Sequence, residues 1–113
     1  VNNELEGTWE VDDVSGAKID FDELYPNKKP IITFNFADHK LTGNSSCNNF
    51  NTTFVINGNN IKFNDPMATK MACPGEGEPF FFNTLKTVTR YSISGNTLNL
   101  IMGDIAVMRL QKK

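Results

Sequence analysis

Cys47 and Cys73 have the most specific chemistry of any residues in this chain. A small, loop-rich domain with two cysteines most economically joins them as one disulfide bond, which predicts an oxidising compartment. The chain-entropy model assigns such a bridge about 3.5 kcal/mol of stability. The alternatives are two free thiols or a redox pair. A redox pair typically has Cys-x-x-Cys spacing, which this sequence lacks.

Asparagines surround the first cysteine, at Asn44, Asn48, Asn49 and Asn51. Their side chains either satisfy the backbone of an irregular loop or take part in recognition, because loops on rigid sheets often carry binding residues. Together with Phe50 they form the candidate binding loop. N-glycosylation sequons begin at Asn44 and Asn51, but this short motif is weak evidence for a modification.

Few other side chains suggest catalysis. Ser45 and Ser46 lie beside Cys47, but no sequence feature supplies an activating base with its orienting acid. The single histidine, His39, falls in a predicted turn, where we expect it to be solvated. We therefore expect no catalytic residues and no enzymatic activity.

Metal binding has equally little support. Two cysteines and one histidine are too few of the usual ligands for a tetrahedral zinc site. Carboxylates gather at 20–23, but their spacing does not match a calcium-binding loop, and we expect a solvated acidic loop. Met67 and Met71 suggest core packing more than a soft-metal site. We expect no metal and no cofactor.

The length of 113 residues fits one domain with a single core, so residues 1–113 are interpreted as one domain and as a monomer. The formal net charge is −2, and the basic pairs at 28–29 and 112–113 form no patch. Nucleic acid is therefore not an expected partner. No apolar run reaches the length needed to span a membrane.

Strand patterns recur at short intervals along the chain. Apolar and polar residues alternate within them, which is typical of strands with one buried face. An Asn-Gly pair at 57–58 lies between two of these runs and is a strong hairpin signal. The runs after residue 90 predict two consecutive hairpins, which form a meander. The predicted strands are 7–11, 31–36, a short one around 41–42, 54–56, 61–63, 91–93, 98–100 and 105–110.

The segment 79–89 has a helical period instead. Phe81, Phe82, Leu85 and Val88 fall on one stripe, and Pro79 suits the first turn. The whole pattern predicts a mostly β (α+β) fold. We expect a small antiparallel, partly barrel-like β meander with one embedded α-helix near residues 79–89.

Two motifs in the middle of the chain are specific: Gly43-x-x-x-Cys47-Asn48-x-Phe50, and Thr69-x-Met71-Ala72-Cys73. A Gly-Thr-Trp sequence at 7–9 precedes them, and a Tyr-x-Ile-x-Gly-x-x-Leu-x-Leu pattern at 91–100 follows. In this order the chain resembles the META domain family, which includes the heat-shock-induced HslJ proteins of bacterial envelopes. Ser46 stands where that family commonly has a glycine directly before the cysteine.

This resemblance implies an exported protein, since many members of the family are lipoproteins or secreted proteins. Some are linked to envelope stress or antibiotic tolerance. It implies no enzymatic activity and no cofactor. We expect the protein in the periplasm, in the outer membrane as a lipoprotein, or at the cell surface. Any export signal or N-terminal lipid anchor would precede Val1, and contact with a membrane would occur only through that anchor.

Our leading hypothesis is a non-catalytic envelope or secreted domain, related to stress, that binds an envelope protein or a cell-wall component. A second hypothesis is a small-molecule-binding barrel, which requires an internal cavity of several hundred Å3. The abundant phenylalanines argue against such a cavity. A third is an inhibitor of an envelope enzyme that uses Asn48, Asn49 and Phe50 as a rigid wedge.

Overall fold

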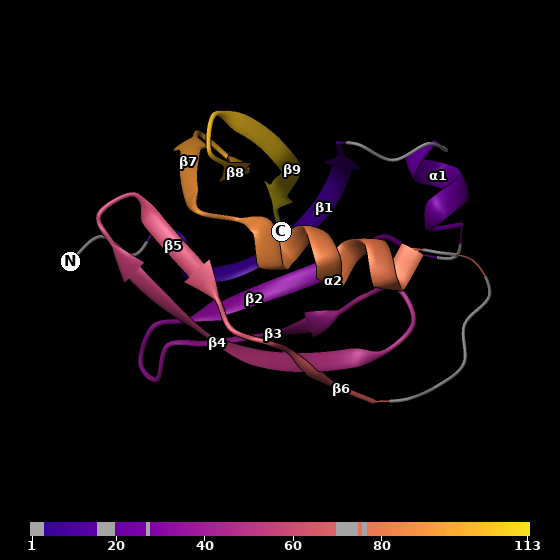
Figure 1. Cartoon of the computed structure of the whole chain (residues 1–113), viewed down its shortest axis with the longest axis horizontal. Helices are drawn as coiled ribbons and strands as arrows, with labels where there is room; N and C mark the ends of the chain where they lie inside the picture. Colours follow the sequence, from indigo (N-terminus) through magenta and orange to yellow (C-terminus); the bar gives the residue numbers. More distant parts are fainter. Residues whose placement is uncertain (1–3, 16–19, 27, 70–74, 76) are drawn as a thin grey trace.

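A computed structural model describes residues 4–15, 20–26, 28–69, 75 and 77–113 (Figure 1). Over these residues the chain forms nine strands and two helices. In chain order they are β1 (Gly7–Val14), α1 (Phe21–Leu24), β2 (Ile31–Asn35), β3 (Lys40–Asn44), β4 (Asn49–Asn57), β5 (Asn60–Phe63), β6 (Met67–Ala68), α2 (Gly77–Thr87), β7 (Arg90–Ser94), β8 (Thr97–Met102) and β9 (Ile105–Lys112). The predicted mostly β fold with one embedded helix is confirmed.

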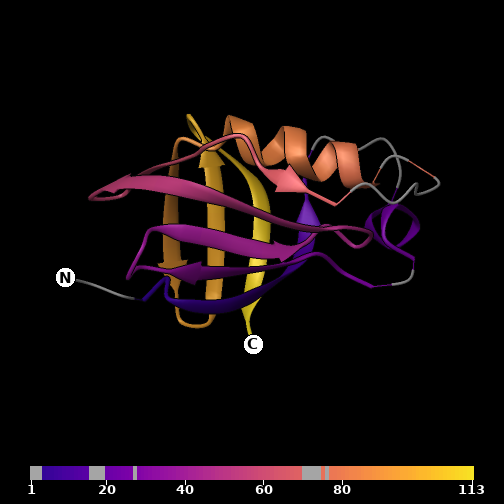
Figure 2. The ribbon, with the colours of Figure 1, turned by 90° about the horizontal axis from the view of Figure 1, so that it is seen from below.

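All strand pairs are antiparallel, and they follow the order β3-β2-β1-β9-β8-β7-β5-β4-β6. Because β3 also pairs with β4, the strands close into a ring (Figure 2). The shortest strand pairing in this ring is between β5 and β7, where Asn60 opposite Arg90 is the single register pair. The sheet therefore has a seam at this point.

The predicted hairpins are present. β4 and β5 meet at the Asn-Gly turn, where Gly58 has a φ of 62°, and β7 and β8 meet at Gly95, with a φ of 60°. Both values lie in the left-handed region that glycine adopts without steric cost. β9 follows β8 antiparallel, which completes the predicted meander.

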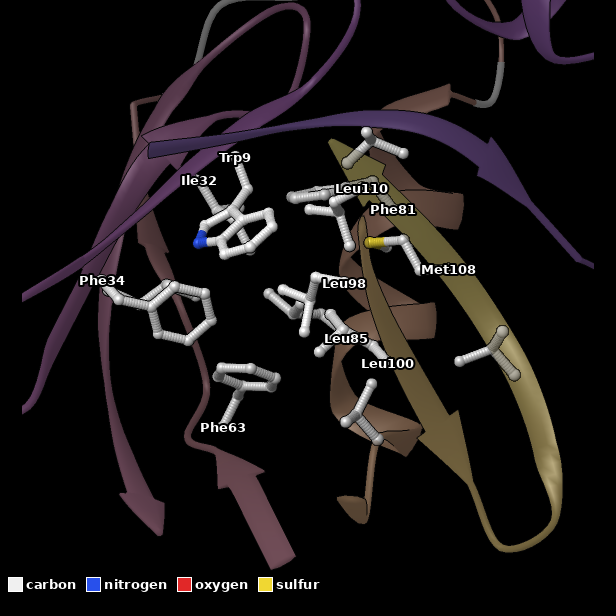
Figure 3. Close-up of a cluster of buried hydrophobic side chains, with 14 of the residues drawn as sticks. Trp9, Ile32, Phe34, Phe63, Phe81, Leu85, Leu98, Leu100, Met108 and Leu110 are labelled. Atoms are coloured by element: carbon white, nitrogen blue, oxygen red, sulfur yellow. The ribbon is translucent and has the colours of Figure 1, made fainter. Parts of the chain in front are cut away.

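Along each strand, successive side chains point alternately into the ring and out to its surface. Trp9, Ile32, Phe34, Leu98 and Leu110 are each at most 1% exposed. Their side chains converge on the centre of the ring, where they meet residues from α2 (Figure 3). Large aromatic and aliphatic groups thus fill this part of the interior, as the number of phenylalanines suggested.

Helix α2 contributes Phe81 and Leu85 to this core, and both are almost fully buried (Figure 3). Val88, just after the helix, is 2% exposed, whereas Phe82 lies at the edge of the core. The helix begins at Gly77, two residues before the predicted start. A Cβ on Gly77 would lie 2.5 Å from the Leu24 carbonyl oxygen, so glycine permits this close packing between α1 and α2.

Residues 20–27 are a loop in our sequence interpretation, with a short helical turn as an option. Within them the structure has the four-residue helix α1. Neither helix in the described part of the chain has the length and hydropathy of a membrane span.

Candidate functional site

The loop between β3 and β4 is closed by its own polar groups. The Ser45 amide donates to the Asn48 carbonyl oxygen at 2.9 Å, and the Ser46 amide donates to the Asn44 side-chain oxygen at 2.8 Å. The Asn48 amide donates to Ser45 Oγ at 3.2 Å. Asparagine and serine stabilise tight turns in this way. Asn44 therefore satisfies the loop backbone, which is one of the two roles considered for these asparagines.

Glu78, in the first turn of α2, connects this loop to the helix. Ser45 Oγ donates to Glu78 Oε2 at 2.6 Å, and Asn48 Nδ2 donates to the same oxygen at 2.8 Å. Thr69 Oγ1 donates to Asn48 Oδ1 at 2.8 Å. Ser45 and Asn48 are at most 1% exposed, whereas Glu78 is half-buried and Thr69 is exposed, so these hydrogen bonds are partly shielded from water. Ser45, Asn48, Thr69 and Glu78 form what we call the polar cluster.

Neither serine of the loop is arranged as a nucleophile. Ser45 has no exposed surface, so a substrate cannot reach its hydroxyl in this conformation. Ser46 Oγ donates instead to the Lys28 carbonyl oxygen at 2.6 Å. The chain's one histidine, His39, is exposed in the β2–β3 turn, with its ring centre 5.5 Å from that of Phe54. It belongs to a different turn from either serine.

Cys47 lies half-buried in the same loop, with its Sγ 3.6 Å from Asn48 Nδ2. Its predicted partner, Cys73, lies outside the described residues. The disulfide between Cys47 and Cys73 therefore stays a prediction. Met71 also lies outside them, and Met67 is 73% exposed on β6 instead of packing in the core.

The five residues of the candidate binding loop differ in their access to solvent. Asn48 is buried in the polar cluster, and Phe50 is 3% exposed, with its ring centre 5.5 Å from Phe81 and 5.3 Å from Phe82. Asn44 is half-buried and donates to Asn49 Oδ1 at 2.9 Å. Asn49 and Asn51 are exposed on β4. Only part of the candidate loop can therefore contact a ligand, and its binding role stays a prediction.

Gly43 of the first specific motif permits a close backbone approach. A Cβ at this position would overlap the Ile31 carbonyl oxygen and lie 3.0 Å from Phe50 Cε1. The motif thus combines a glycine required by packing, a buried amide at Asn48 and a core aromatic at Phe50. Its spacing is explained by structure as much as by recognition.

Sequence reasoning missed a row of uncharged polar side chains on the outer surface of the sheet. Thr8 is opposite Thr33, Thr33 opposite Thr42, and Thr42 opposite Asn51, across β1, β2, β3 and β4. Asn51 is in turn opposite Met67 of β6. We call Thr8, Thr33, Thr42 and Asn51 the polar face. The signal for it was the repeated threonine or asparagine at outward strand positions.

The carboxylates of the acidic segment lie at and within α1. Asp20 is its N-cap, and Asp22 and Glu23 lie in its first turn. The described ranges contain no cluster of three or more histidine, cysteine, aspartate or glutamate residues that suits a metal ion.

Among the described residues outside the loop, Tyr25 and Arg109 have shifted pKa values. Burial raises the pKa of Tyr25, whose hydroxyl donates to the Gly77 carbonyl oxygen at 2.8 Å. The hydrogen bond from Arg109 Nε to Asp12 Oδ1, at 2.9 Å, raises the pKa of Arg109, and the charge of Asp12 adds to this effect. Tyr25 links α1 to α2, and Arg109 links β9 to β1, so both shifts reflect structural contacts.

Solved structures support the fold. The chain is similar to a protein from Burkholderia xenovorans solved by NMR, with a TM-score of 0.74 and 16% identity over 98% of this chain and 85% of that one. It is also similar to a DUF4847 family protein from Bacteroides vulgatus ATCC 8482, with a TM-score of 0.68 and 19% identity over 96% of this chain and 94% of that one. At these identities the likeness concerns the fold alone.

No curated protein is significantly similar to the chain. A family model does match, and it extends from residue 3 to residue 113, which includes the Gly43 motif, the ring of strands and helix α2. The resemblance seen in the sequence is thereby confirmed: this chain belongs to the META domain family.

Proposed function

We propose that this chain is a non-catalytic binding domain of the bacterial envelope or cell exterior, where its polar face binds a cell-wall glycan. An exported location and a stress-related role are part of the proposal, motivated by the predicted disulfide and by the family. The observation that carries it is the row of Thr8, Thr33, Thr42 and Asn51 across four neighbouring strands.

The chemistry of this row suits sugar hydroxyl groups. Threonine hydroxyls and the asparagine amide both donate and accept hydrogen bonds, as do the hydroxyls of a glycan. These side chains are short, so ordering them on binding costs less entropy than ordering lysine or arginine. Neighbouring strands lie about 4.8 Å apart, which spaces the polar groups regularly along the row.

The edges of the polar face add further contacts. Asn44 and Asn49 form the adjacent cross-strand pair, with Asn49 exposed. Met67, opposite Asn51, offers an apolar surface to the carbon–hydrogen face of a sugar ring. Of the exposed members of the candidate binding loop, Asn51 therefore belongs to the row and Asn49 lies beside it, so both are part of one proposed surface.

A non-catalytic role is favoured by the environment of Ser45 and by the absence of clustered metal-ligating residues among the described positions. The other two hypotheses receive less support from the geometry. Large side chains fill the centre of the ring where an internal ligand would lie (Figure 3). A wedge of Asn48, Asn49 and Phe50 would present Asn49 alone, because the other two are buried.

Co-sedimentation with purified cell-wall sacculi tests the proposal. We expect the wild-type chain to sediment with them and a T42V/N51D variant to bind about thirtyfold more weakly, since it loses two donors that each contribute about 1 kcal/mol. A matched control, S92A/N96D, changes exposed positions of the β7–β8 hairpin and should bind like the wild type. Equal binding by both variants, or no sedimentation of the wild type, would contradict the proposal.

A further inference from the structure

The seam between β5 and β7 borders a groove. Beside the single register pair of Asn60 with Arg90, the Ile61 amide donates to the Thr89 carbonyl oxygen and the Tyr91 amide to the Asn59 carbonyl oxygen, both at 3.0 Å. Beyond Ile61, strand β5 lies beside the C-terminal end of α2 instead of β7 (Figure 1). Side chains of a hairpin and a helix end therefore face each other across this opening.

The groove has a volume of about 410 Å3, within the range of small-molecule sites. Its apolar lining residues are Val55, Ile61 and Val88, of which Ile61 and Val88 are each 2% exposed and form the floor. Val55 is 62% exposed, which leaves it accessible to a ligand. The remaining lining residues are polar: Asn57, Asn60, Lys62, Lys86 and Thr89.

Both charged residues of the lining are lysines. Lys62 lies directly opposite Val55 on the neighbouring strand, and in the described part of the chain it forms no ion pair. Lys86 Nζ lies 3.7 Å from Asp65 Oδ1, with both side chains at least half exposed. An exposed pair of this kind contributes little energy, so an incoming anion can replace Asp65 at low cost.

We propose that this groove binds a small amphiphilic carboxylate. Its alkyl part would lie against the exposed Val55, above the floor formed by Ile61 and Val88, and its carboxylate would lie near the ammonium groups of Lys62 and Lys86. Burying the alkyl part removes apolar surface from water, while the lysines select for negative charge. None of the residues that line this groove belongs to the polar face, so the proposal does not depend on glycan binding.

Two probes of equal chain length and opposite charge test the proposal: octanoate and octylammonium. In methyl-resolved NMR titrations of the full chain, octanoate should shift the signals of Val55, Ile61 and Val88 saturably. Octylammonium should bind about tenfold more weakly, because its positive charge is repelled by the ammonium groups of Lys62 and Lys86. Octanoate should also slow exchange of the Tyr91 amide, since the ligand bridges the seam. Equal affinity for the two probes, or shifts centred elsewhere, would overturn the proposal.

Variants separate charge from packing. K62Q/K86Q should weaken octanoate binding about tenfold while leaving octylammonium no weaker, and V55N should weaken both. K28E changes an exposed lysine beside the β3–β4 loop, at the opposite end of β4, and should bind octanoate like the wild type. All four positions are exposed, so circular dichroism should show folded proteins. Unchanged octanoate affinity in folded K62Q/K86Q would exclude the assigned role of the lysines.

Discussion

Asn48 Nδ2 and Glu78 Oε2 lie 2.8 Å apart, although the two residues are separated by 30 positions in the chain. This hydrogen bond joins the β3–β4 loop to the first turn of α2. Thr69 completes the arrangement by donating to the other end of the same amide. The asparagine of the first specific motif thus fixes the position of the helix that fills the core.

Replacing Asn48 with alanine should destabilise the protein by about 1–3 kcal/mol, because the buried amide and its partners Glu78 and Thr69 lose their hydrogen bonds. Urea unfolding followed by circular dichroism measures this free energy. N51A, at an exposed position of β4, is the matched control and should change stability by less than about 0.5 kcal/mol. Equal effects of the two substitutions would contradict the structural role of Asn48.

Ser46 has a φ of 85°, in the region that glycine prefers, which accounts for the glycine that family members commonly have there. S46A and S46G both remove the hydrogen bond to the Lys28 carbonyl oxygen, but only S46G relieves the backbone strain. We therefore expect S46G to be more stable than S46A by about 1 kcal/mol. Thermal and urea unfolding of the pair test this difference, and a more stable S46A would show that the strain is absent.

Lys112 covers the chain's single tryptophan, with its Nζ 4.8 Å from the Trp9 ring centre and 2.5 Å from the Glu6 carbonyl oxygen. K112A should lower stability by about 1 kcal/mol and shift Trp9 fluorescence to longer wavelength, because water reaches the ring. The neighbouring Lys113 pairs with Glu10 at 3.6 Å in an exposed setting. K113A should therefore leave both stability and emission nearly unchanged. An unshifted emission spectrum in K112A would refute this account.

Because Tyr25 is buried, we expect the protein to lose stability in alkaline solution. Burial raises its pKa in the folded state above the ordinary tyrosine value of about 10. Above that pH the unfolded chain releases the phenolic proton while the folded chain retains it, so the free energy of unfolding falls as pH rises. Y25F should reduce this fall, measured by urea unfolding between neutral and alkaline pH. An identical pH dependence in Y25F would assign the effect to other groups.

Local patterns in the sequence were sufficient for most of the secondary structure. Alternation placed Trp9, Ile32 and Phe34 on buried strand faces, and the helical stripe placed Phe81 and Leu85 in the core. These predictions succeeded because burial of one face imposes a period that is visible within a few residues. The Asn-Gly turn at Gly58 is equally local, since its φ depends on the residue itself.

The tertiary structure decided which distant residues meet. Strand register decides the pairing of β1 with β9 and the row from Thr8 to Asn51. The position at which α2 docks decides the contact of Asn48 with Glu78. The groove beside Lys62 likewise exists because β5 and β7 separate after one register pair. No short-range period encodes such relationships, because each is fixed by packing between segments far apart in the chain.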